Sequence, residues 1–195
     1  LLSLIPAAAY AREPIATNAI VSAADPRAAQ AGQDILRQGG SATDAAIAMM
    51  LTLNVVEPHN SGIGGGGFLM HHDGATGVLE SIDGREEAPS AARPDRFMGP
   101  DGKPLAFRDA WPGGYSVGVP GNLRMAWDAH KKWGKLPWAA LFQPAIHAAE
   151  DGFEVRQRLD TAMKAVAPIW ADFPEIQKYF WVDGKPAPMG TMLKN

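Results

Sequence analysis

Two short stretches of this sequence hold residues whose types and spacing could do chemistry. They are the glycine run SGIGGGGFLM at 61–70 and the segment DGREE at 83–87. The side chain of Arg85 offers a planar fork of N–H donors, which can hold a carboxylate through two parallel hydrogen bonds. The alternative role for Arg85 is a salt bridge with one of the acidic residues around it, and local chemistry alone favours that alternative.

The glycine run contains the spacing Gly62-x-Gly64-x-x-Gly67, which is the bare pattern of a dinucleotide-binding turn. Such a site needs a strand, then the glycines, then a helix whose N-terminus receives the phosphates. The predicted order here is the reverse, with a helix over 42–56 before the glycines and a strand over 68–73 after them. Nucleotide binding is therefore not expected. The glycines allow either close packing of two backbones or a loop of N–H groups that lines a ligand pocket, and the residues leave both open.

Other candidate residues carry little chemical signal. The sequence has no cysteine, which excludes thiol nucleophiles and zinc-thiolate sites. His71 and His72 are neighbours in a predicted strand, so their side chains point to opposite faces and cannot share one metal ion. We expect no metal and no cofactor. The net charge is −3 and there is no basic run, so nucleic acid is not an expected partner.

Hydrophobic periodicity and capping residues predict the elements that must position these side chains. Asp25 and Pro26 start a helix that stops at Gly39. Ser41, with Asp44 three residues later, starts a second helix that is nearly apolar all round. The other predicted elements are strands over 17–24, 68–73 and 77–83, a loop over 88–118, and helices over about 121–132, 138–151 and 157–166.

The first residues, LLSLIPAAAYA, resemble the end of a secretory signal that is cleaved after Ala11. This divides the chain into a signal remnant over 1–11 and a mature part over 12–195. No later segment reaches the roughly 20 apolar residues that span a bilayer. We therefore expect a periplasmic or secreted protein without a membrane span. The ending PMGTMLKN closes no element, which suggests a piece of a longer chain.

Five sequence blocks in a fixed order are more specific than any single motif. They are AADPRAAQAGQDILRQGGSATDAAIA, VVEPHNSGIGGGGFLM, DGREEAP, VPGN and KKWGKLPWAALFQPAIHAAEDGF. Together the blocks resemble the N-terminal (large) subunit of the γ-glutamyltranspeptidase family over roughly residues 16–195. The resemblance implies that 12–195 is the N-terminal part of that subunit, incomplete at its C-terminal end.

The resemblance also implies a fold and a reaction. The fold is α+β, an N-terminal nucleophile hydrolase with a four-layer αββα sandwich, of which only the N-terminal part is present. The precursor would cleave itself and expose a threonine as the nucleophile, with its own α-amine as the base. That threonine is expected beyond Asn195, in the C-terminal (small) subunit from the same precursor. No catalytic residue is therefore assigned to this chain, and the chain alone is expected to be inactive.

The implied substrate is the γ-glutamyl amide of glutathione, whose acyl group passes to water, an amino acid or a peptide. On this resemblance Arg85 binds the α-carboxylate of the glutamyl group, which reverses the preference for a salt bridge. The glycines over 62–67 would serve close backbone packing near the subunit junction, with ligand contact secondary. Gly65→Val should then impair folding or maturation more than it alters substrate preference. Two alternatives remain: a cephalosporin or glutaryl acylase of the same superfamily, and an inactive subunit that only pairs with a partner chain.

Overall fold

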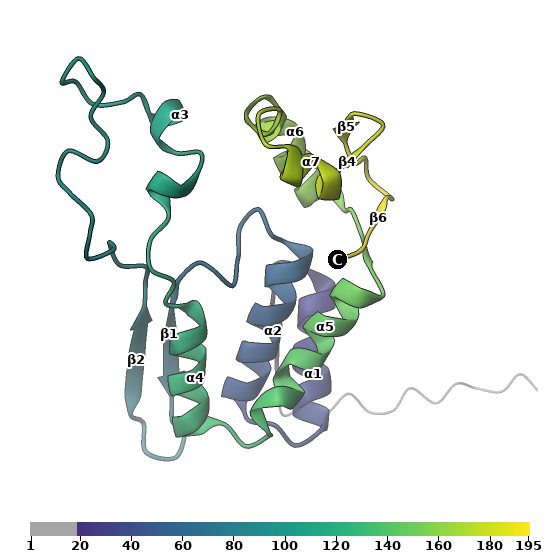
Figure 1. The fold of residues 1–195 in the computed structure, drawn as a ribbon. Coiled ribbons are helices and arrows are strands. Elements are labelled where there is room, and N and C mark those ends of the chain that lie inside the picture. Colours follow the sequence, from purple (N-terminus) through teal and green to yellow (C-terminus); the bar gives the residue numbers. More distant parts are fainter. Residues whose placement is uncertain (1–18) are drawn as a thin grey trace, which may run out of the picture.

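The computed structural model describes residues 19–195 as a group of helices with an antiparallel hairpin along one side (Figure 1). The signal remnant predicted over 1–11 lies outside the described residues. No helix in the described part is long and apolar enough to cross a membrane. The helices are α1 (Pro26–Arg37), α2 (Ala42–Val56), α3 (Phe107–Ala110), α4 (Asn122–Trp133), α5 (Gln143–Glu150), α6 (Gln157–Trp170) and α7 (Pro174–Phe180), with 3-10 turns η1 (Gly114–Ser116) and η2 (Trp138–Phe142).

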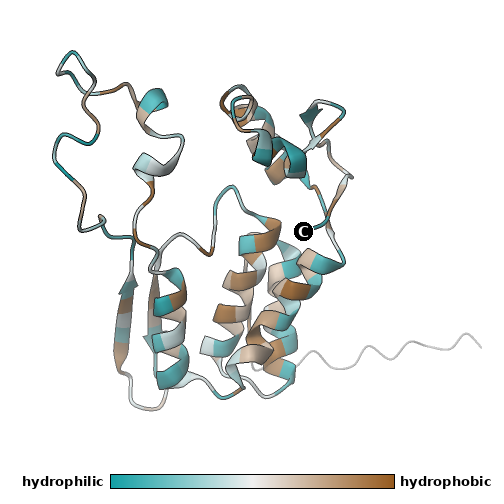
Figure 2. Cartoon of the chain, in the orientation of Figure 1, coloured by the Kyte–Doolittle hydropathy of each residue, from teal (hydrophilic) through white to brown (hydrophobic). Residues whose placement is uncertain are grey.

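Helix α2 lies at the centre of the main group of elements. It packs against α1, α5 and η2, and α4 lies between it and the hairpin (Figure 1). Most of α2 is apolar in Figure 2, which agrees with the prediction of a helix that is nearly apolar all round. Ile47 and Leu51 of α2 meet Ile35 of α1 and Leu141 of η2 in one buried cluster. Burial of each such side chain contributes about 1.5–3 kcal/mol, so this cluster holds α2 in place in the fold.

The start of α2 is held by Asp44, whose side chain is fully buried. The Ser41 hydroxyl accepts from the Asp44 N–H at 3.1 Å and Asp44 Oδ2 accepts from the Ser41 N–H at 2.8 Å, which is the predicted capping box. The same Oδ2 accepts the backbone N–H groups of Lys135 at 2.8 Å and Leu136 at 3.2 Å. One carboxylate therefore joins the start of α2 to the turn after α4.

These contacts make the stability of the protein depend on pH through Asp44. Burial by itself raises the pKa of Asp44, but the N–H donors of Ser41, Lys135 and Leu136 outweigh it and leave that pKa below its ordinary value of 3.8. A pKa lowered by folding stabilises the protein above the ordinary value, and this stabilisation is lost as the pH falls through the folded-state pKa.

We therefore expect Asp44→Asn to lower the free energy of unfolding at pH 7 by about 2 kcal/mol. The same variant should lose less stability than the unsubstituted protein between pH 7 and pH 3. Urea unfolding at both pH values measures this. Asp34→Asn is the control, because the Asp34 side chain of α1 is 47% exposed and pairs with Arg37 at the surface, and it should change stability by less than about 1 kcal/mol. An acid sensitivity unchanged by Asp44→Asn would contradict the assignment.

Strands β1 (Gly67–His72) and β2 (Leu79–Gly84) form the hairpin, with Gly67 opposite Gly84. Helix α4 covers one face of it. His71 lies on that face and stacks on Trp133 with ring centroids 4.2 Å apart, whereas His72 is exposed on the other side. The predicted strands are thus confirmed to within two residues, and so is the opposite direction of the two histidines.

Between β2 and α4 the chain makes the long loop predicted over 88–118, which also holds α3 and η1. The two ends of this loop meet, because Glu87 and Val119 exchange backbone hydrogen bonds of 3.4 and 2.8 Å. The loop therefore leaves and re-enters the fold at one place, directly beside the end of β2.

The prediction of a strand over 17–24 was wrong for the described part of it. Residues 19–24 belong to no helix or strand, because an extended segment becomes a strand only beside a hydrogen-bonding neighbour, and no described strand lies there. The helix expected over 138–151 is divided into η2 and α5. Pro144, which has no N–H to donate, lies in the first turn of α5 and marks the division.

The C-terminal part holds more structure than was predicted. Helix α6 runs to Trp170 and not to residue 166, with Pro168 in its last turn, and α7 comes after it. The short strands β3 (Phe153–Glu154) and β6 (Met192–Leu193) pair with each other, as do β4 (Trp181–Val182) and β5 (Lys185–Pro186). Two-residue strands are too short to show an alternating pattern, so the sequence contained no signal for them.

Candidate functional site

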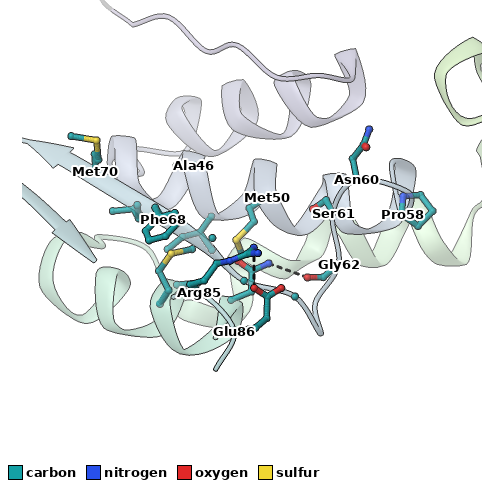
Figure 3. A pocket seen from close by; sticks show the side chains of 18 residues that line it. Ala46, Met50, Pro58, Asn60, Ser61, Gly62, Phe68, Met70, Arg85 and Glu86 are labelled. Atoms are coloured by element: carbon teal, nitrogen blue, oxygen red, sulfur yellow. Dashed lines mark hydrogen bonds and ion pairs between the residues drawn. The ribbon is translucent and has the colours of Figure 1, made fainter. Parts of the chain in front are cut away.

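An open cavity of about 670 Å³ lies where the glycine run, the end of β2 and the start of α4 meet (Figure 3). Its volume is that of a small-molecule site. Met50 of α2 and Phe68 of β1 contribute apolar surface, and the charged groups of its lining are Arg85 and Glu86. The cavity therefore combines an apolar wall with one cation and one anion.

Arg85 comes directly after β2 and lines this cavity (Figure 3). Its backbone N–H donates to the Asp83 carboxylate at 2.8 Å, which fixes the turn at the strand end. Its side chain is 66% exposed. Within the described residues, Glu86 alone supplies a carboxylate at ion-pair distance, with Arg85 Nη1 3.1 Å from Glu86 Oε2. The salt bridge weighed from sequence exists, and most of the guanidinium still faces solvent.

From the sequence, Glu86 was considered only as an acidic neighbour of Arg85. In the structure it also lines the cavity. Its Oε2 atom is buried and makes no hydrogen bond, because the contact with Arg85 has the distance of an ion pair without the direction of a hydrogen bond. The Glu86 side chain as a whole is 28% exposed and lines the cavity, so it is its exposed part, and not the buried Oε2, that can accept a hydrogen bond from a ligand. A guanidinium and such a carboxylate side by side suit a molecule with both a carboxylate and an ammonium group.

The glycine run packs tightly at one position. A Cβ atom on Gly66 would lie 2.4 Å from the Gly84 carbonyl oxygen and 2.8 Å from Glu86 Oε2, closer than real Cβ atoms come. Nothing lies within 4 Å of the corresponding position on Gly62 or Gly64, and no glycine of the run has positive φ. Close backbone packing is confirmed at Gly66, where the absence of a side chain leaves room for β2 and for Glu86.

The same run also lines the cavity, through Gly62 and residues 65–67. Close packing and cavity lining therefore both occur in the run, at different glycines. Gly66 serves the close approach to β2, and Gly62 leaves an open surface toward the cavity.

Asn122, at the first position of α4, is a site residue that sequence reasoning missed. It is 5% exposed and lines the cavity. Its side-chain amide donates to the Gly62 carbonyl and its backbone N–H donates to the Gly65 carbonyl, both at 3.0 Å. The VPGN block contributed to the family resemblance, but nothing in it indicated a partner 60 residues away.

No group of three or more His, Asp or Glu side chains within residues 19–195 is placed to hold a metal ion. The chemistry that these residues offer a ligand is ionic and hydrogen-bonding, from Arg85, Glu86 and the backbone of the glycine run. The arrangement is chemically compatible with a small molecule that carries an amino-acid head group.

The fold places this site in a known class. The solved structure of γ-glutamyltranspeptidase from Helicobacter pylori superposes with a TM-score of 0.84 at 31% identity, over 91% of this chain and 50% of that one. A cephalosporin acylase from Bacillus halodurans superposes with a TM-score of 0.72 at 29% identity, over 86% of this chain and 32% of that one. The class is the N-terminal nucleophile hydrolase fold, as predicted.

Sequence comparison identifies the family within this class. Residues 28–195 match the family model described as Gamma-glutamyltranspeptidase. The glutathione hydrolase proenzyme of Bacillus subtilis is 42% identical over 154 residues, which are 79% of this chain and 26% of that protein. The chain belongs to the γ-glutamyltranspeptidase family. It spans about a quarter of the length of the curated relatives it matches.

Proposed function

We propose that this chain supplies the γ-glutamyl-binding part of a glutathione hydrolase or γ-glutamyltransferase. The observation that carries the proposal is the Arg85 guanidinium, which is largely exposed at a strand end and lines a cavity of about 670 Å³. A γ-glutamyl group carries its α-carboxylate and α-ammonium at the end remote from the amide that is cleaved. Arg85 would hold that carboxylate through paired hydrogen bonds, and Glu86 beside it accepts from a donor on the substrate.

The nucleophile of this reaction lies, on our proposal, outside this chain, as a threonine that self-cleavage of a precursor exposes. Its hydroxyl oxygen bonds to the γ-carbonyl carbon, the amide C–N bond breaks, and the amine leaves with a proton. Water, or the amine of an amino acid or peptide, then takes the acyl group and frees the threonine. The role of this chain is to fix the substrate head group, so that the γ-carbonyl lies at one place. Its partner would be the small subunit from the same precursor.

The cephalosporin or glutaryl acylase alternative is not favoured. The acylase structure superposes less well than the transpeptidase structure, with TM-scores of 0.72 and 0.84. A glutaryl group also lacks the ammonium that distinguishes a glutamyl group, which leaves the Glu86 carboxylate at the cavity without a donor from the substrate. The same cavity can nevertheless be tested against both substrates.

The test is an assay of the complete precursor and of residues 12–195 alone. We expect the processed precursor to hydrolyse γ-glutamyl-p-nitroanilide at least about 100-fold faster, in kcat/KM, than a glutaryl-cephalosporin, a difference of roughly 2.7 kcal/mol. The chain alone should release no p-nitroaniline. Turnover by the chain alone would place a nucleophile within it, and preference for the glutaryl substrate would support the acylase.

We also propose that the protein is exported, with residues 1–11 as the end of its signal. The apolar stretch, the small residues before the cleavage point and the polar sequence after it support this proposal. The absence of cysteine fits either side of a membrane and adds nothing to it.

A further inference from the structure

We propose that Asn122 is a positioning residue that sets the distance between the glycine run and Arg85. The inference takes the identity of the substrate from the proposed function. The positioning role itself is argued from the contacts of Asn122. The side chain of Asn122, at the start of α4, donates a hydrogen bond to the glycine run. The same end of α4 packs against the end of β2.

Two carbonyl groups of the glycine run turn toward Asn122. Gly62 accepts from its side-chain amide and Gly65 accepts from its backbone N–H, both at 3.0 Å. The Gly65 N–H in turn donates to the Gly62 carbonyl at 3.1 Å, which closes the turn between them. The side-chain amide of Asn122 is thus the second donor on the Gly62 carbonyl and ties the far end of this turn to α4.

The N-terminal end of α4 also touches the strand end that bears Arg85. A Cβ atom on Gly121 would lie 2.3 Å from the Gly84 carbonyl oxygen, and one on Gly84 would lie 2.5 Å from Met125 Cβ. Helix α4 therefore packs directly against Gly84, the residue just before Arg85. Through Asn122 the same helix is bonded to Gly62, so one helix contacts both sides of the cavity.

The amide does not serve the helix itself. The N-cap position of α4 is Gly121, where no side chain caps the helix, and the Asn122 amide donates to a separate segment. The residue directly before the first glycine of the run is attached separately to α2, where the Ser61 hydroxyl donates to Asn54 Oδ1 at 2.5 Å. Loss of the amide should therefore release one side of the cavity and leave the helix formed.

The experiment compares Asn122→Ala and Asn122→Asp in the complete precursor. Aspartate keeps the volume of asparagine but places a carboxylate oxygen where the N–H donor was. We expect both variants to raise KM for γ-glutamyl-p-nitroanilide about tenfold, with kcat within roughly threefold. Amide hydrogen exchange of residues 62–66 should become about tenfold faster. If the alanine variant does not fold, KM and hydrogen exchange of the aspartate variant alone test the positioning role.

The control is Thr52→Val, which also removes one buried hydrogen bond, from the Thr52 hydroxyl to the Ala48 carbonyl within α2. It should lower stability without changing KM or the exchange of 62–66. Unchanged KM and exchange in the Asn122 variants, or changes equal to those of Thr52→Val, would overturn the inference. A precursor without γ-glutamyl activity would refute the proposed function instead, and hydrogen exchange alone would then decide the role of Asn122.

Discussion

Gly66→Ala is expected to destabilise the protein by more than about 3 kcal/mol, enough to remove most of the soluble folded protein. The added methyl group would lie 2.4 Å from the Gly84 carbonyl oxygen and 2.8 Å from the Glu86 backbone nitrogen. Both neighbours are backbone atoms, so no side chain can rotate away to make room. Relief would require β2 to move from β1, and Gly84 is itself held by Met125 and Gly121 of the α4 region.

Gly64→Ala provides the matched control, because it adds the same methyl group two residues away. Nothing lies within 4 Å of that methyl position, and Gly64 does not have positive φ. Its stability should stay within about 0.5 kcal/mol of the unsubstituted protein. Soluble yield and urea unfolding of both variants measure the difference. Equal stability of the two variants would show that β2 can move, and that the glycines leave room for a ligand only.

The sequence placed the tightly packed glycine at Gly65, and the structure places it one residue later, at Gly66. A Cβ atom on Gly65 would meet the Gly62 carbonyl oxygen at 3.3 Å and Glu86 Oε1 at 3.4 Å, which small shifts can relieve. A run of adjacent glycines identifies a place of close approach. Which glycine makes that approach depends on how the run lies against β2, and local pattern contains no information on that.

The elements best predicted from the sequence are those whose signals lie within the element. Helices α1 and α2 carry their own caps at Asp25, Pro26 and Ser41, and the hairpin carries its own turn. The strand expected over 17–24 depends on a neighbour that the described chain lacks. Its residue types favour an extended backbone, but hydrogen bonds across a sheet decide whether a strand forms.

The candidate site divides in the same way. Arg85 could be found because its position after a strand and the family resemblance both pointed to it. Asn122 could not, because its partner Gly62 is 60 residues away and the contact exists only after α4 docks on the hairpin. Glu86 was visible as an acidic neighbour, but its buried, unbonded Oε2 depends on the room that Gly66 leaves.

Arg85→Lys is expected to raise KM for γ-glutamyl-p-nitroanilide about 100-fold in the complete precursor, with kcat changed by less than about threefold. Lysine keeps the positive charge but replaces a planar pair of donors by a single ammonium group. Hydrogen bonds to charged groups contribute about 1.5–3 kcal/mol each, and loss of one of two parallel bonds accounts for a change of this size. The ion pair with Glu86, 3.1 Å in the structure, can still form with an ammonium group, so the fold should tolerate the change.

Two controls separate substrate binding from a structural role for Arg85. Arg93→Lys changes an exposed arginine of the long loop that pairs with Asp95 at 3.0 Å and does not line the cavity, so KM should stay unchanged. A 4-aminobutyryl-p-nitroanilide substrate lacks the α-carboxylate, so the Arg85→Lys variant and the unsubstituted enzyme should bind it equally poorly. Arg85→Lys could instead raise KM for both substrates by the same factor, or leave KM unchanged. Either result would show that the arginine acts on the fold through Glu86 and does not bind the carboxylate of the substrate.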